Sequence, residues 1–252
     1  MTVAPLPQAE SEIAENALLG GRVRLRQPKK GYRAGMDAAL LAAAVAAEPG
    51  QRMIEAGCGA GAVLMQIAMR RPGVSLTGLE RDPAMAALAR ENAVLNGTDA
   101  HIVEGDIAAG FRALDLPPFD WAVSNPPFFD DARALRAPSP DKRGAWMADD
   151  GLKAWTDFLL KAVSEGGRIV VIHRADRLAD LLALLGETAG SFAVRGIHPY
   201  ADEPAKRVLV RAIRTGKAPL RLLPPLVLHE RGGAKHTAEA EAILRGEAEL
   251  GW

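Results

Sequence analysis

Three glycines at alternate positions, Gly57, Gly59 and Gly61, follow a short apolar segment and precede a predicted helix. Glycine lets the main chain turn tightly and pass close to a ligand, because no Cβ stands in the way. Taken alone, such a loop could be a dinucleotide fingerprint or merely a tight turn. Glu55 precedes it, and this carboxylate suits a ligand with an ammonium and a sulfonium group better than a pyrophosphate. The loop therefore favours S-adenosylmethionine.

Two further carboxylates end the next two predicted strands. Glu80 lies 23 residues after Gly57, where an acidic side chain can accept hydrogen bonds from both hydroxyls of a ribose. Asp106 ends the following strand and could accept one from an adenine amino group. A nucleoside site is expected where these strands end.

The segment 125–128 follows an apolar strand and reads Asn-Pro-Pro-Phe. Proline fixes its own φ at about −65° and restricts the residue before it, so this turn is stiff. The side-chain oxygen of Asn125 and the carbonyl of Pro126 can accept hydrogen bonds from an exocyclic amino group, which frees its lone pair for a methyl group. Phe128 offers a face on which a flipped base can stack. Apart from its context, the turn could be a β-turn with an aromatic plug; here Asn125, Pro126, Pro127 and Phe128 are predicted to be catalytic.

Basic residues gather in two stretches of a chain whose formal net charge is zero, so nucleic-acid binding would depend on local patches. From the first stretch we predict RNA contacts by Arg22, Arg24, Arg26, Lys29 and Lys30. The alternative is a solvated strand face followed by a turn. The second stretch could flank an RNA groove and holds Lys206, Arg207, Arg211, Arg214, Lys217 and Arg221.

Strands and helices alternate along the chain, which favours an α/β fold with a doubly wound, mostly parallel sheet. Seven strands are predicted, over 52–56, 74–79, 100–103, 120–124, 168–173, 193–198 and 207–213. The last two have no helix between them and would close the sheet as an antiparallel hairpin. Residues 1–19 are expected to form an irregular arm, 22–26 a short strand or hairpin arm, and 130–150 a long functional loop.

These motifs resemble a known family. The glycine loop, Glu80 and Asp106 are similar to the cofactor motifs of Rossmann-like class I methyltransferases, and Asn-Pro-Pro-Phe resembles the Asn-Pro-Pro-Tyr/Phe motif of amino-methyltransferases. The run from Arg24 to Ala44 looks like the segment before the core in bacterial tRNA1(Val) (adenine-37-N6)-methyltransferases. This resemblance covers residues 22–214 and implies methyl transfer from S-adenosylmethionine to an adenine N6 in RNA, most specifically adenine 37 in the anticodon loop of a valine tRNA.

The resemblance also implies a division of the chain. Residues 1–50 would be an N-terminal arm and cofactor-covering segment, and residues 51–252 the core with its closing hairpin and tail. Met36 departs from the small hydroxyl residue often found in that segment. Cofactor contacts are expected from the glycine loop and from Tyr32, Arg33, Gly35, Asp37, Glu55, Glu80, Asp106 and Asn125.

Alternative functions share parts of this pattern. A protein glutamine N5-methyltransferase uses the same acceptor geometry but usually carries a helical N-terminal domain, whereas about fifty residues precede the glycine loop here. Adenine N6-methylation of rRNA or DNA is a second alternative. A non-catalytic RNA-binding module is disfavoured by the intact set of motifs. With one cysteine, scattered histidines and no long apolar run, we expect a cytoplasmic protein without a metal or membrane contact.

Overall fold

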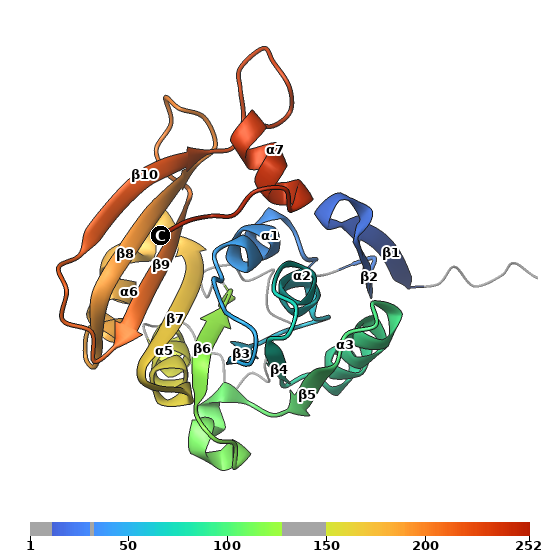
Figure 1. Cartoon of the computed structure of the whole chain (residues 1–252), viewed down its shortest axis with the longest axis vertical. Coiled ribbons are helices and arrows are strands. Elements are labelled where there is room, and N and C mark those ends of the chain that lie inside the picture. The colour runs from blue at the N-terminus through green and yellow to red at the C-terminus, as the bar shows by residue number, and fades with distance from the viewer. Residues whose placement is uncertain (1–11, 31–32, 128–149) are drawn as a thin grey trace, which may run out of the picture.

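The computed structural model describes residues 12–30, 33–127 and 150–252. Its main feature is an eight-stranded sheet in the order β10-β8-β9-β7-β6-β3-β4-β5 (Figure 1). The strands are β3 Arg52–Ala56, β4 Ser75–Glu80, β5 Ala100–Glu104, β6 Phe119–Ser124, β7 Val163–Arg174, β8 Ala189–His198, β9 Arg207–Arg214 and β10 Arg221–Val227. The predicted loop over 130–150 lies almost wholly outside the described residues.

The strand directions bring most carboxyl ends to one edge of the sheet. Strands β3 to β7 are parallel neighbours, β9 runs antiparallel to both β7 and β8, and β10 is parallel to β8. The predicted antiparallel closure by β8 and β9 is therefore confirmed. The carboxyl edge thus holds the ends of β3 to β8 and β10 together with the start of β9.

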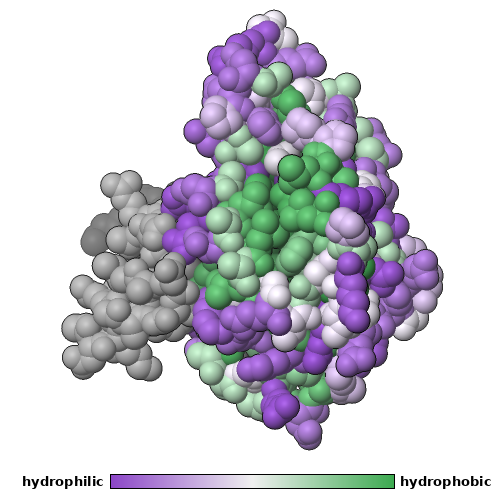
Figure 2. Space-filling model, turned by 90° about the vertical axis from the view of Figure 1, so that its left-hand side faces the viewer, coloured by the Kyte–Doolittle hydropathy of each residue, from purple (hydrophilic) through white to green (hydrophobic). Residues whose placement is uncertain are grey.

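The predicted count of seven strands was wrong, because the edge strand β10 extends the sheet. It contains Pro224 and Pro225, with a shift of register between Leu223 and Leu226. Proline cannot donate to a strand ladder and is tolerated at an edge, so the two prolines disguise this strand in the sequence. The side of the molecule on which β10 lies shows an apolar surface (Figure 2), and Leu222 is 76% exposed there.

Helices cover both faces of the sheet, as a doubly wound fold requires. On one face α1, α2, α3 and α7 contribute to one hydrophobic core, while α5 and α6 contribute to the other. Their bounds are α1 Met36–Ala43, α2 Ala62–Arg70, α3 Pro83–Leu95, α5 Asp150–Ala162, α6 Leu178–Leu185 and α7 Ala238–Arg245. Among these described helices, none is long and apolar enough to cross a membrane.

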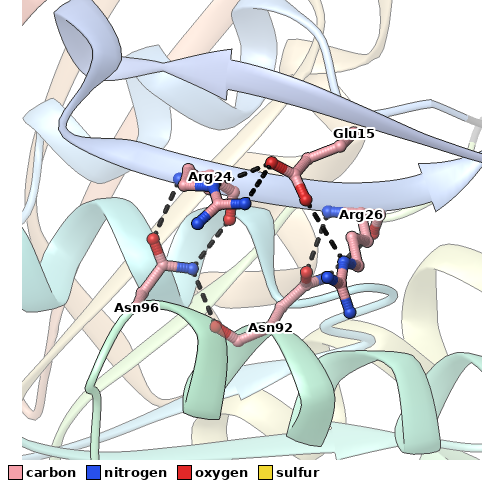
Figure 3. Close-up of polar contacts among 5 residues, drawn as sticks. All are labelled: Glu15, Arg24, Arg26, Asn92 and Asn96. Carbon is pink, nitrogen blue, oxygen red and sulfur yellow. Dashed lines mark hydrogen bonds and ion pairs between the residues drawn. The ribbon is translucent and has the colours of Figure 1, made fainter.

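The N-terminal segment is more regular than expected. Residues 13–18, predicted to be irregular, form β1 Ile13–Leu18, which pairs antiparallel with β2 Val23–Pro28. Asn92 of α3 and Asn96, the C-cap residue of this helix, hold the hairpin through their side chains (Figure 3). The amide of Asn92 bonds both the N–H and the carbonyl of Arg26 at 2.8 Å, and Asn96 bonds the main chain of Arg24 in the same way. The hairpin is therefore fixed to the core, whereas the sequence predicted an irregular arm over residues 1–19.

Candidate active site

The glycine loop after β3 has a conformation that requires glycine. Gly57, Gly59 and Gly61 have φ of 69°, 54° and 82°, in the left-handed region that side chains disfavour. The Cys58 N–H donates to the carbonyl of Leu79 at 2.9 Å, which ties the loop to the end of β4. Helix α2 then begins directly after Gly61. The loop predicted from the sequence is thus a tightly turned connection at the carboxyl edge.

Gly57 has a second reason to lack a side chain. A Cβ at this position would lie 2.3 Å from Cη2 of Trp155, closer than any real contact. Trp155 comes from α5 and is 8% exposed. The sequence explains Gly57 by a tight turn and a close ligand but does not reveal Trp155, because nothing in it indicates that α5 reaches this loop.

Glu80 is held by the main chain. Its Oε2 accepts from the N–H of Gly59 at 2.8 Å, and its Oε1 accepts from that of Asp82 at 2.9 Å. Each carboxylate oxygen has a second lone pair, so this fixed carboxylate can still accept from two ribose hydroxyls. At the end of the next strand, Asp106 accepts from the Ala108 N–H at 2.9 Å. Both predicted nucleoside-binding carboxylates therefore stand at neighbouring strand ends.

Glu55 is a buried carboxyl group at the entry to the loop. It is 3% exposed, and its Oε2 has no hydrogen-bond partner among the described residues. Burial, with the charge of Glu80 as a smaller cause, raises the pKa of Glu55 well above its ordinary value. A buried acceptor of this kind gains most from a cationic donor. This observation fits the ammonium end of S-adenosylmethionine.

One cavity joins the N-terminal segment, the glycine loop and the catalytic turn. It is lined by Gln27, Ala34, Ala38, Gly57, Cys58, Gly59, Ala60, Ala62, Val63, Met85 and Asn125. Gln27 is 3% exposed and orders the segment above the cavity. Its Oε1 accepts from the Ala34 N–H, and its Nε2 donates to Asn16, both at 2.9 Å. Gln27, Ala34 and Ala38 thus form part of the wall, and the covering role of the segment stays a prediction.

The other residues predicted in that segment have partners elsewhere. Arg33 donates to Asn16 at 2.9 Å, and Asp37 forms an ion pair with Arg207 at 2.9 Å. Gly35 precedes the first turn of α1. Tyr32 lies outside the described residues. The cofactor contacts assigned to these four residues stay predictions.

The Asn-Pro-Pro turn, predicted to be catalytic, is anchored to β3, the strand that precedes the glycine loop. Ser124 is fully buried and its Oγ donates to the carbonyl of Ala56 at 2.9 Å, which fixes the end of β6 against the end of β3. Asn125 follows and reaches the cavity wall. Pro126 is buried and Pro127 half-buried. Phe128, the predicted stacking residue, lies outside the described residues. The turn thus holds an amide beside the glycine loop, where it can face a transferable methyl group.

The basic residues of the N-terminal hairpin have mostly internal partners. Arg22 donates to the carbonyls of Arg245 and Gly246 at the end of α7. Arg24 and Arg26 share the carboxylate of Glu15, at 2.7 and 3.3 Å (Figure 3). The remaining two predicted contacts, Lys29 and Lys30, are exposed. The hairpin therefore offers less positive charge to an RNA than its sequence suggests.

Asn92 was also missed by the sequence analysis. It is fully buried, and besides Arg26 its Nδ2 donates to the carbonyl of Ala60 at 2.9 Å. One amide therefore ties the hairpin to the glycine loop. The signal in the sequence was a polar residue on the apolar face of the predicted helix.

No group of three or more His, Cys, Asp or Glu residues in the described ranges could hold a metal ion.

Comparisons with known proteins agree with this arrangement. The family model of the methyltransferase small domain matches residues 33–137. The tRNA1(Val) (adenine(37)-N6)-methyltransferase of Yersinia pestis (strain Pestoides F) is 36% identical over 179 residues, which are 69% of this chain and 70% of that protein. The release factor glutamine methyltransferase of Deinococcus radiodurans is 32% identical over 172 residues, 66% of this chain and 59% of that protein.

The match to some relatives is partial. Across three of them the aligned part spans 59%, 44% and 61% of their length. A crystal structure described as a predicted O-methyltransferase from Agrobacterium tumefaciens is similar over nearly its whole length. It superimposes with a TM-score of 0.68 and 28% identity, covering 86% of this chain and 99% of that one.

Proposed function

The chain belongs to the tRNA1(Val) (adenine(37)-N6)-methyltransferase family, and on that premise we propose that it methylates the N6 of an adenine in RNA. The specific substrate that we propose is adenine 37 of a valine tRNA. The observation that carries this proposal is the cavity that Asn125 shares with the glycine loop. An amino-group acceptor and a methyl-donor site meet there.

The predicted site residues would have separate roles, and of these Asn125 lines the cavity. Glu80 would accept from the ribose hydroxyls, Asp106 from the adenine amino group, and Glu55 would compensate the ammonium charge of S-adenosylmethionine. When bound, this cofactor supplies the electrophilic methyl group. Asn125 and the Pro126 carbonyl would accept from the target N6 amino group, and this interaction strengthens as the nitrogen becomes tetrahedral and cationic.

Glutamine N5-methylation is the second candidate, because the Deinococcus radiodurans relative has that name and the same amide geometry would serve it. The RNA substrate has the stronger support, because the Yersinia pestis relative is 36% identical over 70% of its length, against 32% over 59% for the glutamine methyltransferase.

The test uses the full chain with labelled S-adenosylmethionine, given in parallel to tRNA from cells lacking the activity and to a peptide-chain release factor. We expect label in tRNA, and nucleoside mass spectrometry should identify it as N6-methyladenosine. Label in the release factor with none in RNA would replace the proposed substrate by the second candidate. No label in either acceptor would contradict both.

A further inference from the structure

A group of cationic side chains lies beside the catalytic turn, at the carboxyl end of β7. Ser124 pairs with Val171, so in this register residues 125–127 continue alongside 172–174 of the neighbouring strand. Neighbouring strands lie about 4.8 Å apart. Arg174, the last residue of β7, is the cross-strand partner of Arg207, the first residue of β9. Arg174 and Arg207 therefore lie on the two strands next to the Asn-Pro-Pro turn, at the same edge of the sheet.

The pKa of a buried histidine reflects the positive charge of this region. His173 is 3% exposed, and its pKa is lowered to about 4 by burial. The positive charges of Arg177, Arg174 and Arg207 contribute to the shift, while Asp176 acts in the opposite direction. His173 is consequently neutral at pH 7, and three positive charges surround it.

Each of these arginines also has an acidic partner. Arg174 pairs with Asp176, Arg177 with Asp180 at 2.7 Å, and Arg207 with Asp37 at 2.9 Å. The arginine side chains are 25–33% exposed. A guanidinium carries five N–H donors, of which a carboxylate engages at most two, so an ion pair orients the group without exhausting it. Such partly exposed pairs are weak and can exchange a carboxylate for a phosphate.

Lys206 adds a cation whose main chain is fixed. It is exposed, and its carbonyl accepts from the Ala175 N–H at 3.2 Å, which joins the start of β9 to the end of β7. Other members of the same basic stretch lie farther along β9 or beyond it. Arg214 ends β9 at the opposite edge, about 24 Å away at 3.4 Å per residue, and donates to the carbonyl of Val163. The second basic stretch of the sequence is thus divided between two edges.

We propose that Arg174, Lys206 and Arg207 bind the phosphate backbone of the RNA strand next to the adenine that enters the site. This inference rests on the proposed function and adds the contact that holds the substrate at the catalytic turn. Its ligand is a phosphodiester, because a guanidinium group matches phosphate oxygens with two parallel N–H bonds, and phosphate contacts position a nucleic acid without reading its sequence.

The test measures binding of an unmodified valine tRNA transcript to the full chain over a range of salt concentrations. Arg174→Gln and Lys206→Gln should each weaken binding roughly three- to tenfold, and should make the negative slope of log K against log salt shallower by about 0.7–0.9. Asp176→Asn should act in the opposite direction and strengthen binding about twofold or more, since it removes a carboxylate that competes with phosphate. If the Arg174–Asp176 pair were only structural, both variants would lose stability and neither would bind RNA more tightly.

Lys217→Gln is the matched control, because Lys217 is an exposed cation just beyond the opposite end of β9. It should leave the affinity and the slope unchanged. Thermal unfolding and binding of S-adenosylhomocysteine identify any variant that fails to fold. Parental slopes in the folded Arg174→Gln and Lys206→Gln proteins would overturn this inference while RNA methylation by the parent still supported the proposed function. A parent that neither binds nor methylates RNA would remove both.

Discussion

The two halves of the carboxyl edge hold their functional groups by different means. At the ends of β3 and β4 the groups are fixed by the main chain: glycines in the left-handed region and a Glu80 carboxylate bound by two N–H groups. At the carboxyl end of β7 and the start of β9, the functional groups are held by ion pairs such as that of Arg207 with Asp37. A small cofactor of constant shape suits the first arrangement, and a long polyanion that must bind and leave suits the second.

The largest effect is expected where the two halves meet. Asn125→Ala should lower the rate of methyl transfer on the order of 100-fold, equivalent to about 3 kcal/mol, because its acceptor acts mainly in the transition state. Affinity for S-adenosylhomocysteine should be nearly unchanged. Single-turnover methylation at saturating cofactor measures the rate, and thermal unfolding confirms the fold. A folded variant with the parental rate would show that Asn125 is not part of the chemistry.

The half of the edge formed by β7 and β9 should affect how the stability of the protein depends on pH. His173 has a pKa of about 4 when folded and an ordinary value of 6.5, so below pH 6.5 the unfolded chain binds a proton that the folded chain does not. Its contribution to the free energy of unfolding should fall by roughly 3 kcal/mol as the pH drops from 7 to 4. Urea titrations of the parent and His173→Gln across this range isolate the effect from that of the carboxylates. If the free energy of unfolding fell equally with pH in the parent and in His173→Gln, the lowered pKa of His173 would be contradicted.

The main-chain half should be sensitive to one methyl group. Gly57→Ala introduces a side chain at positive φ and against Trp155, and should lower the free energy of unfolding by about 2 kcal/mol or more. Trp155→Leu removes the ring that the new Cβ would meet. The double variant should therefore lose less than the sum of the single variants in denaturant titrations. Simple additivity would mean that the two residues do not constrain each other.

Cofactor affinity should depend on the fixed carboxylate. Glu80→Ala should weaken binding of S-adenosylhomocysteine about tenfold or more in calorimetry, because two ribose hydroxyls lose an ionised acceptor. Glu104→Ala is a matched control, since Glu104 ends the adjacent strand β5 and pairs on the surface with Arg90. Equal dissociation constants for the parent and Glu80→Ala would remove Glu80 from the site.

The smallest effect is expected from the N-terminal hairpin. Lys29→Ala with Lys30→Ala should weaken RNA binding a few-fold and flatten its salt dependence by at most about 0.9 per phosphate contact. Arg24→Ala should change the slope less, because Glu15 already neutralises Arg24. Salt titrations of both variants provide the measurement. If the parent and both variants had the same salt dependence, the hairpin would not contact the RNA backbone.

Local patterns predicted much of this molecule. The positions of Gly57, Glu80 and Asp106 at successive strand ends followed from alternating strands and helices, because a parallel sheet brings such ends together. Asn92 and Trp155 could not be found in this way, since each acts on a loop remote in the sequence. The division of the second basic stretch could not be seen for the same reason: Arg207 begins β9, whereas Arg214 ends it at the opposite edge of the sheet.

The C-terminal tail links the last residues of the chain to the wall of the cavity. The Trp252 indole donates to the carbonyl of Ala44, 208 residues earlier, and the Leu250 N–H donates to that of Ala43. Both acceptors end α1, whose Ala38 lines the cavity. During synthesis, α1 leaves the ribosome long before its last partners exist. The α1 wall of the cavity therefore lacks two of its hydrogen bonds until residue 252 has been made and has left the ribosome, and a nascent chain stalled before residue 250 should bind S-adenosylhomocysteine more weakly than the released chain.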